Sequence, residues 1–66
     1  MNELSKTEYS VLVCLGEGMT NKQIAEYLYI SPNTVYKHVQ AIIRKLGVSN
    51  RTQAALAFVN SIGKGL

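Results

Sequence analysis

The sequence predicts one all-α domain built of four helices. Its 66 residues suffice for a single small domain and are too few for a second one. Helix start signals recur along the chain, and the strongest is Ser31-Pro32, a capping residue followed by proline at the first helical position. Glycines at Gly16, Gly18 and Gly47 are placed to end helices. We therefore treat residues 1–66 as one domain without strands.

Composition excludes several classes of protein. One cysteine, Cys14, and one histidine, His38, can make neither an internal disulfide nor a four-ligand zinc site. The absence of aspartate removes the Ser-His-Asp triad and the EF-hand loop. No apolar run approaches the ~20 residues of a membrane span, and the N-terminus shows no secretory signal. We expect a cytoplasmic protein that is no enzyme and uses no cofactor, metal or membrane.

The first helix begins at a capping box. The hydroxyl of Ser5 can accept from the backbone N–H of Glu8, while Glu8 reaches back to Ser5. Leu12 and Leu15 follow at helical spacing, and the segment 16–18, Gly-Glu-Gly, ends the helix.

The second helix is short. Either Thr20 or Asn21 caps it, and Ile24, Ala25 and Leu28 fall on one side of it. This pattern predicts a helix that packs through one apolar face.

The third and fourth helices complete the domain. The third runs from Pro32 to about Leu46 and ends at Gly47 in the left-handed conformation. The fourth covers roughly residues 51–61, before Gly63.

Charge is divided unevenly along the chain. Residues 1–26 carry two basic and four acidic residues, a net charge of −2. Residues 27–66 carry five basic residues and no acidic one, a net charge of +5. Such unopposed positive charge is typical of a surface that meets phosphates, although a merely solvated basic surface has the same composition.

The third helix has two different faces. One face is apolar and is expected to be buried; it carries Val35, Val39, Ile42 and Leu46. The opposite face is polar and free of acids; it carries Asn33, Lys37, Gln40 and Arg44, with the small Ala41 beside them. Lys and Arg can bind phosphate or guanine, and Asn and Gln can pair with adenine. An ordinary amphipathic helix would also show a polar outer face, so this face alone does not establish that the helix binds DNA.

The order of elements favours DNA binding. A short helix, the three-residue connection 29–31 and a basic helix that begins with proline match the helix-turn-helix. In this motif the second helix enters the major groove and the first crosses the backbone. The sequence therefore predicts that the protein binds double-stranded DNA.

Residues from about 4 to 60 resemble the LuxR/NarL/FixJ type of helix-turn-helix, the GerE-like domain that ends many bacterial response regulators and quorum sensors. The matching residues are Leu4, Glu8, Val11, Leu12, Gly18, Asn21, Lys22, Ile24, Ala25, Leu28, Ile30, Ser31, Thr34, Val35, His38, Lys45, Leu46, Gly47, Val48, Arg51, Gln53 and Ala54. The resemblance implies a bacterial transcription regulator that binds DNA as a dimer. It is either a stand-alone regulator or the output domain of a response regulator.

The resemblance also implies roles for particular residues. It places base reading at Tyr36, Lys37 and Gln40. Seven other residues are expected at the DNA backbone, three of them at the start of the second helix, where exposed N–H groups suit a phosphate: Thr20, Asn21, Lys22, Asn33, Thr34, Arg44 and Lys45. Dimerisation falls to the fourth helix, at Ala54, Ala57 and Phe58. Whether the homodimer forms only on DNA, and whether RNA polymerase is a partner, is left open.

Three positions depart from the family pattern. Thr7 and Ser10 stand where the family usually has Arg and Glu, so this pair of charges is absent. Tyr36 stands where Lys is commoner, and a lysine occupies the next position, Lys37. This change leaves the operator sequence open.

A few other residues have expected roles within the fold. His38 is placed at the edge of the buried face, to pack or hydrogen-bond beside the first helix, and Cys14 in the core. Glu8 is expected to close its capping box and to pair with a cation such as Arg51. Three tyrosines are expected at the rim: Tyr9, Tyr27 and Tyr29.

Two other functions fit part of the pattern. Promoter-binding region 4 of a sigma factor has a similar helix-turn-helix, but Arg51 and the turn 46–48 favour the regulator. A helical protein-interaction adaptor would use the apolar fourth helix, yet it has no reason to keep the polar face of the third helix free of acids.

Overall fold

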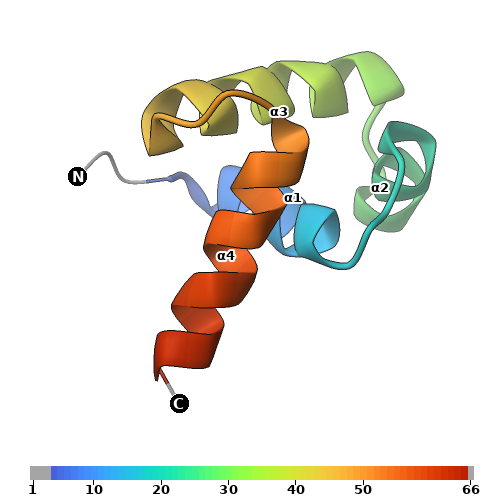
Figure 1. Cartoon of the computed structure of the whole chain (residues 1–66). Helices are drawn as coiled ribbons and strands as arrows, with labels where there is room; N and C mark the ends of the chain where they lie inside the picture. Colours follow the sequence, from blue (N-terminus) through green and yellow to red (C-terminus); the bar gives the residue numbers. More distant parts are fainter. Residues whose placement is uncertain (1–3, 66) are drawn as a thin grey trace.

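The protein folds into four helices, seen in a computed structural model that describes residues 4–65. They are α1 Lys6–Gly16, α2 Asn21–Leu28, α3 Pro32–Leu46 and α4 Arg51–Gly65. No strand occurs among residues 4–65, so the all-α prediction is confirmed. The ends of the predicted domain, residues 1–3 and 66, lie outside the described part. Figure 1 shows α3 lying across one side of the molecule, while α4 runs away from it and projects beyond the other helices.

The helix starts follow the predicted caps. The Ser5 hydroxyl accepts from the N–H of Glu8 at 3.1 Å, and the Glu8 carboxylate accepts from the N–H of Ser5 at 2.9 Å. Of the two candidates for α2, Thr20 is the cap, and Gln23 closes a second capping box that the sequence analysis did not single out. Ser31 caps α3 directly before the proline, as predicted.

The helix ends agree less well with the sequence. Gly47 ends α3 with φ 69°, the predicted left-handed conformation. Tyr29 ends α2 with φ 60° and ψ 43°, a conformation that usually selects glycine or asparagine. The predicted end of α4 near residue 61 was wrong, because the helix continues through Gly63 to Gly65. Glycine inside a helix costs about 1 kcal/mol relative to alanine but does not require a break.

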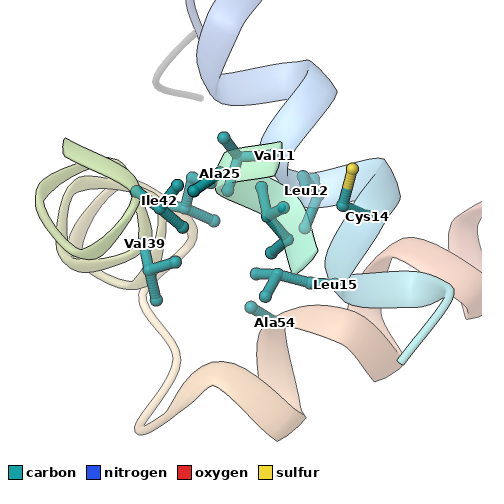
Figure 2. Close-up of a cluster of buried hydrophobic side chains, with 10 residues drawn as sticks. Val11, Leu12, Cys14, Leu15, Ala25, Val39, Ile42 and Ala54 are labelled. Carbon is teal, nitrogen blue, oxygen red and sulfur yellow. The ribbon is translucent and has the colours of Figure 1, made fainter. Parts of the chain in front are cut away.

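All four helices contribute to one core (Figure 2). Its ten buried apolar residues are Val11, Leu12, Cys14, Leu15, Ile24, Ala25, Val35, Val39, Ile42 and Ala54. The predicted inner face of α3 is confirmed, with Leu46 half-buried at its end. Cys14 is a core residue, as expected, and burial raises the pKa of its thiol. Burial on this scale must supply most of the stability, since no disulfide ties the described helices together.

A close contact between α1 and α4 depends on a glycine. The ring of Phe58 lies over Gly16, so that a β-carbon at this position would stand 2.8 Å from the ring carbon Cδ2. Tyr9 meets the same ring edge-on, with centroids 5.9 Å apart and an interplanar angle of 76°. The last residue of α1 therefore lacks a side chain because an aromatic ring of α4 occupies its place.

We predict that Gly16→Ala destabilises the domain. A better helix former would gain about 1 kcal/mol. Overpacking against Phe58 costs typically 1–3 kcal/mol and should outweigh that gain. Urea denaturation followed by circular dichroism measures the sum. In a Phe58→Leu background, Gly16→Ala should lower the free energy of unfolding by less than it does in the parent. If Gly16→Ala alone stabilised the domain, the ring of Phe58 would not constrain this packing.

Candidate nucleic-acid interface

The outward face of α3 is the polar face that the sequence predicted. Its side chains are all exposed, and they are Asn33, Lys37, Gln40 and Arg44. Tyr36, beside them, is 54% exposed, and Ala41 is half-buried. The other helices lie on the opposite side of α3, which leaves this face uncovered (Figure 1). Five of the predicted DNA-contacting side chains are thus brought to one accessible surface.

The start of α3 is held firmly beside this face. The Ser31 hydroxyl accepts from the backbone N–H of Thr34 at 3.1 Å and lies 2.9 Å from the Thr34 hydroxyl. Thr34 is half-buried, and its hydroxyl takes part in the cap through this contact with Ser31. The first turn of α3 is therefore preorganised, with Asn33 exposed on it.

The N-terminus of α2 offers backbone donors. The N–H groups of Asn21 and Lys22, at the first two helical positions, have no acceptor within the helix. Lys22 is exposed, and α2 has no acidic residue in its first turn. This end of α2 has the donors, the dipole and the charge that suit a phosphate.

Arg51 lies behind that helix end. It donates from Nη1 to the side-chain oxygen of Asn21 and from Nη2 to the carbonyl oxygen of Met19, at 3.1 Å. The expected pairing of Glu8 with Arg51 was therefore wrong. Arg51 opens α4, where Asn21 and Met19 are nearer to it, and the cation that Glu8 meets comes from another helix.

That cation is Lys45. Its ammonium nitrogen lies 2.7 Å from Oε1 of Glu8, and the Glu8 residue is only 8% exposed. The hydrogen bond from Lys45 and that from Ser5, together with the charges of Lys45 and His38, hold the pKa of Glu8 below its usual range, against the opposing effect of burial. His38 is half-buried, and its charge acts on Glu8 of α1. Lys45 is 33% exposed, so its ammonium is engaged within the domain and its contact with DNA stays a prediction.

The residues expected at a dimer contact have different surroundings. Ala54 is fully buried, and Phe58 packs on α1, so both side chains belong to the core of the single domain. Ala57 is exposed. The apolar surface that α4 presents is made by larger residues that the sequence analysis did not name: Leu56, Val59 and Ile62, which are 56%, 48% and 47% exposed.

Comparison with known proteins agrees with this geometry. The pattern of the family described as bacterial regulatory proteins, luxR family, matches residues 2–58, which is most of the chain. The chain belongs to the LuxR family. The predicted resemblance is confirmed, and the domain is the DNA-binding domain of a transcription regulator, in a family that is not a class of enzymes. The match also favours a regulator over the sigma-factor and adaptor alternatives.

Individual LuxR-family relatives are regulators from several bacteria. The transcriptional regulatory proteins LnrK and LiaR of Bacillus subtilis are 54% and 49% identical over 82% and 80% of this chain, which correspond to 24% and 25% of those proteins. The DNA-binding transcriptional activator DevR/DosR of Mycobacterium tuberculosis is 41% identical over 85% of this chain and 26% of its own length. The chain therefore spans about a quarter of these relatives.

No helix within residues 4–65 of the LuxR domain combines the length and the apolar character that crossing a membrane requires.

We predict that the LuxR domain loses stability at acid pH because Glu8 becomes protonated. Its pKa is lowered in the folded state, so the unfolded chain takes up the proton first as pH falls. The stabilisation is complete above the ordinary pKa of 4.5 and is lost as pH falls from there through the folded value. Urea denaturation of the parent and of Glu8→Gln, between neutral and acid pH, measures their free energies of unfolding. The difference between the two should shrink as pH falls below 4.5. A difference independent of pH would contradict the ion pair.

Proposed function

We propose that this LuxR-family domain binds double-stranded DNA in a sequence-specific manner with α3 in the major groove. One observation carries the proposal: the outward face of α3 is exposed, polar and free of acidic residues. An exposed helix face has no internal need to exclude acids, whereas a face that approaches phosphates does. The helix is also the second of a helix-turn-helix, the element that enters the groove in this motif.

Base reading falls to Tyr36, Lys37 and Gln40. Lys37 can donate to guanine, Gln40 can pair bidentately with adenine, and the phenol of Tyr36 offers a donor, an acceptor and an apolar ring for a thymine methyl. All three are exposed on α3. Asn33 and Arg44, nearer the two ends of the same face, are placed for the sugar-phosphate backbone.

A second set of backbone contacts is proposed at α2. The N–H groups of Asn21 and Lys22 and the Lys22 ammonium face a phosphate, with Thr20 as the cap that shapes this end. Thr34 and Lys45 add contacts from the cap and the last turn of α3. Because Lys45 already donates to Glu8, it has two remaining donors for a phosphate.

Pairing of two copies through α4 is proposed with a revised surface. Thr52, Leu56 and Val59 are exposed at i, i+4 and i+7, so they share one side of the helix, away from the buried Ala54. A two-fold pair would place two α3 helices in successive major grooves, about 34 Å apart. The site would then be an inverted repeat. Such a regulator would act in the bacterial cytoplasm; no described surface singles out RNA polymerase.

Binding should weaken steeply with salt. If the domain neutralises roughly five phosphates, the logarithm of its affinity should fall with the logarithm of salt at a slope of about −0.9 for each phosphate. Fluorescence anisotropy of a labelled duplex, selected from a random pool, measures this slope. A slope near zero would remove DNA as the partner.

Lys37 and Lys22 should have different effects on specificity. Lys37→Ala should cost about 1–3 kcal/mol on the selected site and relax its sequence preference, because Lys37 is proposed to read a base. Lys22→Ala, the matched control, should weaken selected and random duplexes alike, because Lys22 is proposed to bind a phosphate. Equal losses on both duplexes for Lys37→Ala would reassign Lys37 to the backbone.

A charge on the outer side of α4 should prevent pairing. Val59→Glu would place a charge in the proposed apolar contact, and Val59 is 48% exposed and not among the buried core residues. We expect cooperative binding to the inverted repeat to be lost, while binding to one half-site is retained. Analytical ultracentrifugation measures pairing, and titration of duplexes with one and with two half-sites measures cooperativity. Lys6→Glu, at an exposed residue of α1, is the control. Unchanged cooperativity would move the pairing surface away from this side of α4.

A further inference from the structure

Arg51 joins α4 to the turn that precedes α2. Its guanidinium donates from both terminal nitrogens, to the side-chain oxygen of Asn21 and to the carbonyl oxygen of Met19. These two acceptors flank Thr20, the N-cap of α2. One side chain from a distant part of the sequence therefore holds the residue before the cap and the residue after it.

The turn itself is held from the other side by α1. The N–H of Met19 donates to the carbonyl oxygen of Cys14 at 3.2 Å, and Gly18 adopts φ 79°. Met19 is thus tied through its N–H to α1 and through its carbonyl to Arg51. This double attachment fixes where α2 begins.

The hydrogen bond to Asn21 also decides how its amide is oriented. A guanidinium has donors only, so the oxygen of the Asn21 amide must face it. The amide nitrogen, with its two donors, is then directed away from Arg51. In the absence of this bond both orientations of the amide would be open. Lysine would lose the planar fork, because the three donors of its ammonium all radiate from one nitrogen atom.

We propose that Arg51 is a positioning residue for DNA binding, which directs the donors of Asn21 and the start of α2 toward a backbone phosphate. The inference rests on the proposed phosphate contact of α2. Arg51 itself is half-buried behind that helix end, and its fork is used inside the domain. Its contribution to affinity therefore passes through Asn21 and the N–H groups of α2, and it carries no sequence preference.

The substitution Arg51→Lys tests the fork while the charge is kept. We expect affinity for selected and random duplexes to fall alike, by roughly tenfold, the loss expected for one charge-assisted contact. The salt slope should change by less than about 0.9, the value for one phosphate neutralised by a cation, because Lys22 and the charge at position 51 are both kept. Circular dichroism and urea denaturation of each variant establish that the assays compare folded protein. A variant that is less stable yet binds both duplexes with the parent's affinity would overturn the proposal.

A double-mutant cycle keeps the test independent of folding. Asn21→Ala removes the amide donors, and in that background Arg51→Lys should cost less affinity than it does in the parent, because one of the two routes through which Arg51 acts is gone. Additive losses would overturn the positioning role, since Arg51 would then not act through Asn21. The cross-peak of the Lys22 amide in a nitrogen–hydrogen correlation spectrum should shift when random duplex is added to the parent, and less so in Arg51→Lys.

Lys22→Ala tests the proposed phosphate contact of α2 separately from the positioning role of Arg51. If Lys22→Ala and the parent bind random duplex equally, the phosphate contact of α2 fails, and the role of Arg51 fails with it. If Lys22→Ala weakens binding while Arg51→Lys does not, the phosphate contact stands and the positioning role alone is wrong.

Discussion

One carboxylate, that of Glu8, joins the start of α1 to the end of α3. It accepts the N–H of Ser5, which closes the cap of α1, and it accepts the ammonium of Lys45 from the last turn of α3. Because Glu8 is almost fully buried, breaking either bond would leave a charge with little water around it. The start of α1 and the end of α3 are therefore held in a fixed relative position. A shift of one helix against the other would break the hydrogen bond between Glu8 and Lys45.

Burial of the apolar face of α3 determines which side of this helix is available. Val35, Val39 and Ile42 are turned into the core, so the polar residues half a turn away are turned outward. The cap at Ser31 fixes the other end of α3. A helix held at both ends and buried along one face presents its outer side chains in a set geometry, which is what recognition of base edges in a groove requires.

The last helix serves two parts of the molecule. Its first residue, Arg51, reaches the start of α2, and its middle closes the core through Ala54 and Phe58. The opposite side remains apolar at Leu56 and Val59. A domain of this size buries a limited share of its surface, so an apolar side left over on one helix is where a partner would add buried area. The same helix thus connects the packing of the monomer with the surface assigned to pairing.

Local features of the fold followed from the sequence by itself. The capping box of α1, the proline at the start of α3, the left-handed Gly47 and the inner face of α3 depend on residues within about four positions of one another, and that is the range over which helix caps and periodicity operate. The polar face of α3 was predicted for the same reason. The positive φ of Tyr29, at the end of α2, was not predicted, because neither glycine nor asparagine stands there. The tertiary structure alone decided which cation meets Glu8, where Arg51 donates and that Ala54 is enclosed. Each of these depends on how helices distant in sequence approach one another, and spacing along one helix carries no information about that approach.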